Sequence, residues 1–221
     1  MASRLALFDL DNTLIDRAAL FRGWALDSLR RWGADDGDVG WLIELDRDGL
    51  TERESFFEAV RTRYGIPETT PDLVTAYYED YPSFTVPPSP ETLAALRSLR
   101  DRDWRTCIVT NGPTMQEEVV DRAGLREIVD AVCVSSTVGL RKPDPLIFQH
   151  AADLSGLPLT GAWMIGDSPS HDMGGAIAAG LKSVWISRGR EWVEPQYQPT
   201  LIATTVTDAV AQMLAAEDAV R

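Results

Sequence analysis

The chain has 221 residues, of which 44% are hydrophobic and 25% charged, and its formal net charge is −13. These values are typical of a globular protein with one core, or with one core and a smaller domain. The charge argues against a nucleic-acid backbone or an anionic membrane surface as a partner, and no apolar run reaches the ~18 residues of a transmembrane helix. A small phosphate ester stays possible, because a bound metal ion reverses the field inside a site.

The first predicted element is a strand over Leu5–Phe8, whose four apolar residues are followed at once by Asp9 and Asp11. An apolar run of this kind predicts a strand buried on both faces, and ligands bind at the carboxyl end of such strands. Buried carboxylates are costly unless they are paired or bind metal. The two acids therefore indicate a site, although a strand followed by an acidic helix cap would show the same residues.

Phosphoryl transfer through an aspartate fits this pair. Asp9 is predicted as the nucleophile and as a Mg²⁺ ligand, because a hard cation removes the repulsion between a carboxylate and a phosphate. Asp11 is predicted as the acid that protonates the leaving alkoxide and then as the base for the hydrolytic water. The strand begins so early that we expect no signal peptide and a cytoplasmic protein.

Residues 16–84 contain helical patterns and no strand-like run, which predicts a small helical domain inserted after the first strand. Helices are expected over Arg17–Trp32, with Asp16 as its N-cap, and over Asp38–Asp46. A third is expected from Thr51, where Thr51-x-x-Glu54 has the form of a capping box, and a fourth from Pro71.

The inserted segment has eight arginines and 15 acidic residues, which we interpret as solvated helix faces. Arg22 and Trp24 are candidates for contact with a substrate because they are near the first acidic pair in the sequence. The alternative for Trp24 is a place in the core of the inserted domain.

From Pro87 onward the pattern alternates between helices and strands, which predicts a parallel, doubly wound α/β sheet. The predicted strands are Arg105–Thr110, Ala131–Ser135, Ala162–Ile165 and Ser183–Ile186. The predicted helices begin at Ser89-Pro90, Thr114, Asp144-Pro145, His171 and Thr207. Cys107 and Cys133 are in predicted strands and are interpreted as buried thiols of a reducing compartment.

Three further polar groups follow these strands. Thr110-Asn111-Gly112 can present a hydroxyl and backbone N–H groups to phosphate oxygens, although Asn-Gly is also a common turn. Lys142 precedes Pro143, which restricts its backbone, and its ammonium can neutralise a carboxylate and a phosphoryl group. The neighbouring Arg141 is the alternative.

The last group is Gly166-Asp167-Ser168-Pro-Ser-His-Asp172. Asp167 ends an apolar run as Asp9 does, so the two carboxylates could bind one divalent cation, with the backbone carbonyl of Asp11 as a further ligand. Asp172 and Ser168 are predicted to support the site, with Asp172 holding Lys142 or a metal-bound water. The alternative for Asp172 is a favourable acid in the first turn of a helix. His171 is expected to be exposed and incidental, and His150 to be structural.

The four segments, in this order, resemble the haloacid dehalogenase superfamily of hydrolases over about residues 1–16 and 86–190. The resemblance implies a Rossmann-like core over residues 1–15 and 85–221 with strand order 3-2-1-4-5, and a helical cap domain over residues 16–84. It implies Asp9 as nucleophile, Asp11 as acid and base, Thr110 as a phosphate ligand and Lys142 beside the phospho-aspartate. Asp167 would bind Mg²⁺ and Asp172 would support it.

The expected function is therefore a Mg²⁺-dependent phosphatase that acts on a small phosphorylated metabolite. Asp11 favours ester hydrolysis over 2-haloacid dehalogenation, because an alkoxide leaving group needs a proton and a halide does not. A phosphomutase uses the same residues and stays open. A receiver-like signalling module is disfavoured because it has no use for a cap. We expect no nucleic-acid or membrane partner, and either a monomer or a homodimer.

Overall fold

The computed structural model describes residues 4–219, which form two compact units. One unit contains the chain up to Ile15 and from Pro87 onward, and the other is Asp16–Val86. The second unit thus ends two residues after the predicted end of the insertion. Within the described residues, no helix combines the length and the apolar character that crossing a membrane requires.

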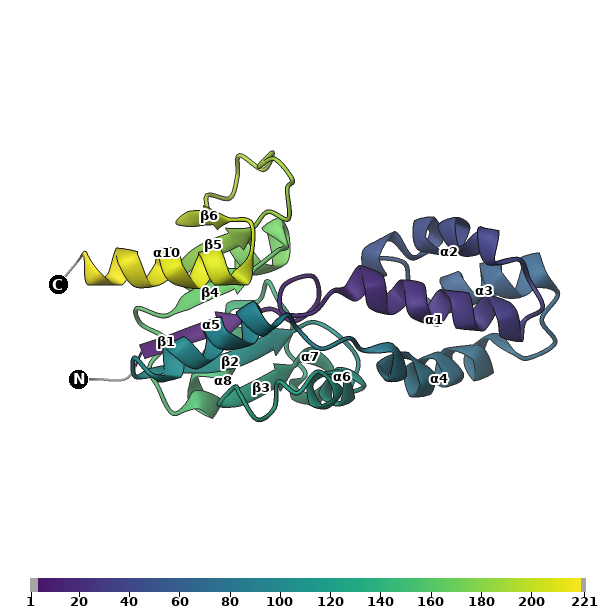
Figure 1. The fold of residues 1–221 in the computed structure, drawn as a ribbon, viewed down its shortest axis with the longest axis horizontal. Helices are drawn as coiled ribbons and strands as arrows, with labels where there is room; N and C mark the ends of the chain where they lie inside the picture. Colours follow the sequence, from purple (N-terminus) through teal and green to yellow (C-terminus); the bar gives the residue numbers. More distant parts are fainter. Residues whose placement is uncertain (1–3, 220–221) are drawn as a thin grey trace. The chain divides into compact units, whose positions relative to one another are not determined.

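The first unit is built on a sheet of six parallel strands in the order β3-β2-β1-β4-β5-β6 (Figure 1). The strands are β1 (Arg4–Phe8), β2 (Trp104–Thr110), β3 (Ala131–Val134), β4 (Trp163–Gly166), β5 (Lys182–Ile186) and β6 (Leu201–Ala203). The doubly wound parallel sheet and the order of its first five strands are confirmed. The sixth strand was not predicted, because three residues are too short a run to show a pattern.

Helices cover this sheet: α5 (Pro90–Arg100), α6 (Gln116–Arg122), α7 (Ser135–Val138), α8 (Pro145–Ser155), α9 (Gly175–Ala178) and α10 (Val206–Asp218). α5 and α10 pack against each other and lie in front of the sheet in Figure 1. α8 packs against β1, β2 and β3 over a core that includes Leu7, Val109 and Phe148. The predicted starts of α5 and α8 are confirmed, and Ser89 and Asp144 cap these helices by accepting backbone hydrogen bonds from Thr92 and Leu146.

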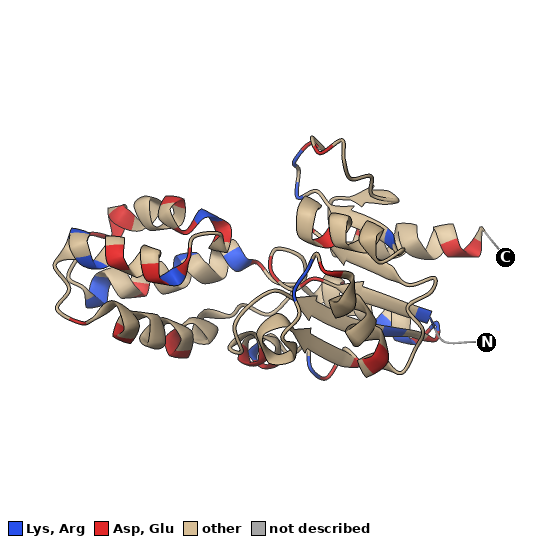
Figure 2. Ribbon diagram, turned by 180° about the vertical axis from the view of Figure 1, so that it is seen from behind, with Lys and Arg blue, Asp and Glu red and all other residues tan. Residues whose placement is uncertain are grey.

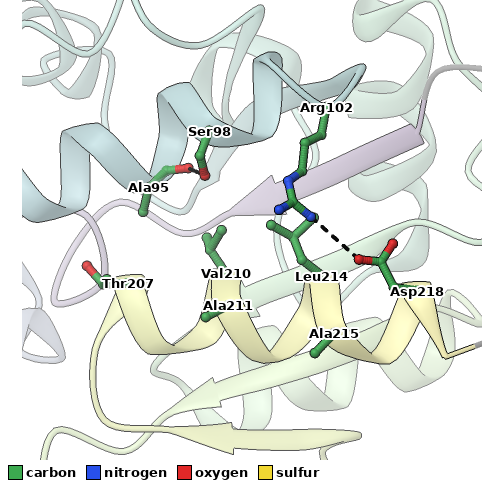
Figure 3. A pocket seen from close by; sticks show the side chains of 9 residues that line it. All are labelled: Ala95, Ser98, Arg102, Thr207, Val210, Ala211, Leu214, Ala215 and Asp218. Carbon is green, nitrogen blue, oxygen red and sulfur yellow. Dashed lines mark hydrogen bonds and ion pairs between the residues drawn. The ribbon is translucent and has the colours of Figure 1, made fainter.

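A pocket lies between α5 and α10 (Figure 3). Its walls include Ala95, Val210 and Leu214, and Arg102 forms an ion pair of 3.5 Å with Asp218 at its edge. None of the predicted site residues lines this pocket.

The second unit consists of α1 (Arg17–Arg31), α2 (Val39–Asp46), α3 (Arg53–Tyr64) and α4 (Thr70–Asp80), with short 3-10 turns between and after them. Asp16 caps α1 as predicted, by accepting a hydrogen bond from the backbone N–H of Ala19. Trp24 is 2% exposed and its ring lies 5.4 Å from that of Phe21, 5.9 Å from Phe57 and 4.8 Å from Tyr77. Trp24 is therefore part of the core of this unit.

Charged residues of both signs run along the helices of this unit (Figure 2), but they are not all solvated. The Asp46 carboxylate is buried and accepts hydrogen bonds from Arg17 at 2.8 Å and Arg53 at 2.6 Å, both also buried. The interpretation of these charges as solvated faces is wrong for this cluster. Charged side chains are stable in a buried position such as this only when they are paired.

The predicted capping box of α3 is also wrong. The N-cap is Glu52 and makes no side-chain cap hydrogen bond, while the Thr51 hydroxyl donates to the carbonyl oxygen of Leu45 at 2.5 Å. Leu45 lies in the last turn of α2, so the Thr51 hydroxyl bonds to the preceding helix and does not cap α3.

Candidate active site

The register of the sheet brings three of the predicted residues to one edge. Phe8, the last residue of β1, is paired with Ile108 of β2 on one side and Ile165 of β4 on the other. Asp9, Thr110 and Asp167 therefore lie at the carboxyl ends of three adjacent strands. From β1 the chain adds β2 and β3 on one side of the sheet and then β4, β5 and β6 on the other. The switch point between β1 and β4 is where open α/β sheets bind ligands.

The centre of the site is the ammonium group of Lys142, which is 2% exposed. Its Nζ donates to Asp9 Oδ1 at 2.6 Å and to Asp172 Oδ1 at 2.7 Å. Both carboxylates are buried as well, Asp172 completely. The alternative cation Arg141 is exposed, so the sequence preference for Lys142 agrees with the geometry.

Burial and charge act in opposite directions on this cluster. Burial has the largest influence on Asp9 and raises the pKa of its carboxyl well above the ordinary value; Lys142 opposes this, and Asp172 and Asp167 add to it. Burial alone would lower the pKa of Lys142, but the carboxylates of Asp172 and Asp9 outweigh it and the pKa is raised. Lys142 is therefore charged at neutral pH.

Asp9, Asp167 and Asp172 are the residues that could hold a metal ion. Each offers one carboxylate oxygen, and these oxygens lie within 4.8 Å of one another. In the part of the chain that the structure describes, this cluster does not include the side chain of Asp11, and it does include Asp172, which was predicted only as a supporting residue. All three donors are carboxylate oxygens, which suits a divalent cation with oxygen ligands.

Asp167 is held by two residues that the sequence did not single out. Arg190 Nη2 donates to Asp167 Oδ2 at 3.0 Å and to its backbone carbonyl at 2.8 Å, and the indole N–H of Trp185 donates to the same carbonyl at 2.9 Å. Arg190 lies in the loop after β5, where no motif marks it. Arg190 is 23 positions from Asp167 in the sequence, so the contact could not be predicted from a local motif.

Asp172 is fixed by the segment after β4. Residues Pro169–Gly174 form a π-helical turn, and the backbone N–H of Ser168 donates to Asp172 Oδ2 at 2.9 Å. Gly166 leaves the room for this carboxylate, since a Cβ there would lie 2.2 Å from Asp172 Oδ2. The predicted helix from His171 to residue 179 is thus wrong in its first turn. Single π turns of this kind are frequent at functional sites.

The turn after β2 supplies two different functions. Thr110 Oγ1 is buried and has no hydrogen-bond partner among residues 4–219, so it is available to a ligand. The Asn111 side chain is engaged: its Nδ2 donates to the Lys142 carbonyl at 2.9 Å and its Oδ1 accepts from the Lys142 N–H at 2.8 Å. The Asn111 side chain thus holds the backbone of Lys142, and phosphate binding by the backbone N–H groups of this turn stays a prediction.

Asp11 Oδ2 accepts a hydrogen bond of 2.6 Å from Gln116 Nε2 on α6. Gln116 is 4% exposed and was not recognised from the sequence. The only sequence signal for it is its position one helical turn after the Asn-Gly turn.

Three secondary expectations are settled by burial. His171 is half-buried and not exposed, and burial lowers the pKa of its imidazole. Trp24 is buried in the core of its own unit and is not accessible to a substrate. Arg22 is exposed, so it stays a candidate for substrate contact. Cys107 and Cys133 are free and buried, as expected.

A family model for haloacid dehalogenase-like hydrolases matches residues 4–180. The chain belongs to this family. The match includes all four polar segments and the helical unit between the first two of them.

Two of the similar proteins are named as phosphatases. Phosphoserine phosphatase of Thermus thermophilus is 35% identical over 150 residues, which are 66% of this chain and 58% of that protein, so the match spans little more than half of that relative. Glyceraldehyde 3-phosphate phosphatase of Pyrococcus abyssi is 29% identical over 85% of this chain and 82% of that protein. The family and these names indicate a hydrolase of phosphoric monoesters.

Among solved structures, a 2-haloacid dehalogenase from Pseudomonas syringae superposes with a TM-score of 0.66. It is 26% identical, and the superposition covers 98% of this chain and 100% of that one. The fold is therefore shared with a member of the family that is named for a different reaction.

Proposed function

We propose that this protein hydrolyses a small phosphorylated metabolite through a phospho-aspartate on Asp9, with Mg²⁺ as its cofactor. The observation that carries the proposal is the Asp9 carboxylate, which lies beside the Lys142 ammonium and in a cluster of three acids at the carboxyl end of the sheet. The phosphatases named among its relatives support the reaction class.

The proposed metal site consists of Asp9, Asp167 and Asp172. Their donors are all carboxylate oxygens, which Mg²⁺ prefers. When bound, Mg²⁺ would supply positive charge against the transferred phosphoryl group. The backbone carbonyl of Asp11, predicted as a further ligand, keeps that role as part of the proposal.

The first step is the attack of an Asp9 carboxylate oxygen on the phosphorus of the ester. The new bond from Asp9 to phosphorus forms as the bond from phosphorus to the leaving oxygen breaks. Protonated Asp11 gives its proton to that oxygen, so the alcohol leaves neutral. In the second step Asp11 takes a proton from a water that attacks phosphorus. The bond to Asp9 then breaks, which releases inorganic phosphate and restores both carboxyl groups.

Two residues are proposed to bind the phosphoryl oxygens. Thr110 Oγ1 is buried without a partner among the described residues, as a donor reserved for a ligand would be. Lys142 contributes a fixed positive charge that its carboxylate partners keep protonated. Asn111 supports this by holding the backbone of Lys142 and by offering its own backbone N–H.

Asp11 is the residue that argues for ester hydrolysis over dehalogenation. A halide leaves without a proton, so a dehalogenase needs no acid at this position, whereas an alkoxide does. A phosphomutase would also need Asp11 and differs only in the acceptor of the phosphoryl group. We further propose that the helical unit Asp16–Val86 acts as the cap domain of this enzyme.

The test is the release of phosphate from p-nitrophenyl phosphate, with and without Mg²⁺, by the wild type and by the variants Asp9→Asn and Asp153→Asn. Asp153 is exposed on α8 and serves as the matched control. Activity that needs Mg²⁺ and Asp9 but survives in the control supports the proposal. The Asp9→Asn rate should fall by at least ~10³-fold, as for the loss of a nucleophile.

Three outcomes would contradict the proposal. Near wild-type activity of Asp9→Asn would exclude the covalent intermediate. No phosphate release under any condition, together with halide release from a 2-haloacid, would indicate a dehalogenase. A stable label on Asp9 after treatment with an acyl phosphate, without ester hydrolysis, would indicate a receiver-like role.

A further inference from the structure

Gln116 is a buried amide in the first turn of α6 that the proposed reaction does not yet use. Its Nε2 donates to Asp11 Oδ2 at 2.6 Å, across 105 positions of the sequence. Its Oε1 is buried and has no hydrogen-bond partner among residues 4–219. A buried amide with only one of its ends satisfied is an unusual arrangement, and such groups call for a functional explanation.

The backbone around Gln116 is built to hold this amide in place. The N–H of Gln116 donates to the carbonyl of Pro113 at 3.0 Å, which closes the turn that leads into α6. The side chain lies against Gly112, where a Cβ would come within 2.6 Å of Gln116 Cγ and 3.0 Å of Nε2. The absence of a side chain at Gly112 therefore provides the space in which the Gln116 amide reaches Asp11.

The same turn also positions another part of the site. Asn111 holds the backbone of Lys142, and Gln116, five residues later, contacts Asp11. Thr110, at the start of the turn, presents a hydroxyl that has no hydrogen-bond partner among residues 4–219. One short segment thus contacts both the cation and the acid that the proposed reaction uses.

The contact between Gln116 and Asp11 differs in kind from the ion pairs of the other acids. Asp9 and Asp172 are paired with Lys142 and Asp167 with Arg190, so each has a cationic partner. The group that Gln116 presents to Asp11 is neutral, and it holds the carboxyl through a hydrogen bond without adding charge. Among the described residues, the cluster that could hold a metal ion does not include the Asp11 side chain.

We propose that Gln116 is a positioning residue for Asp11, which keeps the Asp11 carboxyl in one orientation, outside the metal-ligand cluster, for proton transfer to the leaving oxygen. This inference rests on the proposed function, because it assigns Asp11 the role of the acid. Loss of the Gln116 amide should therefore harm the reaction most when the leaving group depends most on a proton.

The experiment compares wild type, Gln116→Met and the control Gln149→Met on two esters. Methionine keeps the length of glutamine and removes the donor. Gln149 is an exposed glutamine on α8 that donates to Asp153 and touches none of the site residues. The two esters are p-nitrophenyl phosphate, whose leaving group needs little protonation, and ethyl phosphate, whose leaving group needs a full proton.

For Gln116→Met, kcat/KM on ethyl phosphate should fall by ~10²-fold, the lower end of the effect of general acid catalysis, with the loss in kcat. On p-nitrophenyl phosphate the fall should be less than about threefold, since acid assistance matters little there. The control should leave both values unchanged. A crystal structure of Gln116→Met should show the Asp11 side chain in more than one orientation.

Equal losses on both esters would overturn the inference, because a merely structural role does not distinguish leaving groups. Unchanged activity on both would overturn it as well. If Gln116→Met does not fold, as urea unfolding will show, Gln116→Ala removes the same amide and is read in the same way. A wild type that hydrolyses neither ester would refute the proposed function and the inference together, whereas an active wild type with uniform losses would refute the inference alone.

Discussion

The side-chain amide of Asn111 pairs with both backbone polar groups of Lys142, at 2.9 Å and 2.8 Å, across 31 positions of the sequence. This arrangement fixes the point from which the Lys142 side chain extends toward Asp9 and Asp172. In the proposed reaction, an asparagine that the sequence marked as a phosphate ligand therefore acts on the phosphate through Lys142.

Replacement of Asn111 by alanine should leave the N–H and carbonyl of Lys142 without these partners. We expect the free energy of unfolding to fall by roughly 1–3 kcal/mol, the cost of unsatisfied buried groups. Phosphatase activity should fall as well, because Lys142 loses its fixed position. Urea unfolding and p-nitrophenyl phosphate hydrolysis measure the two effects. Wild-type stability would mean that water replaces the amide without cost.

Lys142→Met tests the central cation, and the chain offers a matched control because Lys182 is its only other lysine. Removal of Lys142 leaves two buried carboxylates without their shared partner, and we expect a loss of ~3–5 kcal/mol in the free energy of unfolding measured in EDTA. The rate of ester hydrolysis should fall by ~10²-fold or more.

Lys182→Met should cost at most about 1 kcal/mol, because the Lys182 side chain is 44% exposed and its pair with Glu217 lies near the surface. Similar losses of stability in the two variants would contradict a special role for the buried ammonium. Full activity of Lys142→Met would shift the proposed phosphate contact to Arg141.

Gly166→Ala should disturb the acid cluster without altering any charge. The added methyl group would lie 2.2 Å from Asp172 Oδ2 and 2.4 Å from Cγ of the same residue, so the carboxylate has to move. We expect a loss of ~1–3 kcal/mol in the free energy of unfolding, as for other overpacked sites. Mg²⁺ binding, measured by calorimetry, should weaken at the same time.

The control for this variant is Gly40→Ala in α2, where nothing lies within 4 Å of the added methyl group. It should be neutral or stabilising by up to about 1 kcal/mol, since alanine favours the helix. Unchanged Mg²⁺ affinity in Gly166→Ala would show that Asp172 is not a metal ligand.

Glu217→Gln tests an electrostatic contact of the fold that lies outside the candidate site. Glu217 on α10 accepts hydrogen bonds from Lys182 at 2.6 Å, Trp163 at 3.0 Å and Arg4 at 3.0 Å, so it ties the helix to three strands. Burial opposes its ionisation, but these partners outweigh burial and lower the pKa of Glu217 below its ordinary value of 4.5.

A lowered pKa in the folded state contributes stability above pH 4.5 that is lost as the pH falls through the folded value. The difference in unfolding free energy between wild type and Glu217→Gln should therefore have its greatest value at pH 7 and decrease below pH 4.5. Urea unfolding across this range measures it, with the exposed Glu58→Gln as control. A difference that does not vary with pH would mean that packing and not charge stabilises this contact.

The local features of the chain could be predicted because their signals are local. An apolar run before Asp9, and another before Asp167, marked two buried strands and the acids that follow them, since a strand end and its turn span only a few residues. The alternation of helices and strands after Pro87 predicted a parallel sheet, and the resemblance supplied the order of its strands. Two short elements, β6 and the π turn at Pro169–Gly174, were not predicted because they are too short to show a distinct period.

The sequence by itself thus determined the class of fold and the acids and lysine of the candidate site. Only the tertiary structure decided which side chain meets which: Gln116 with Asp11, Arg190 with Asp167, and Asn111 with Lys142. These partners come from loops and helix ends 23 to 105 positions apart. Their contacts depend on the register of the sheet and on the paths of the turns at its edge, and no residue pattern within one segment carries that information.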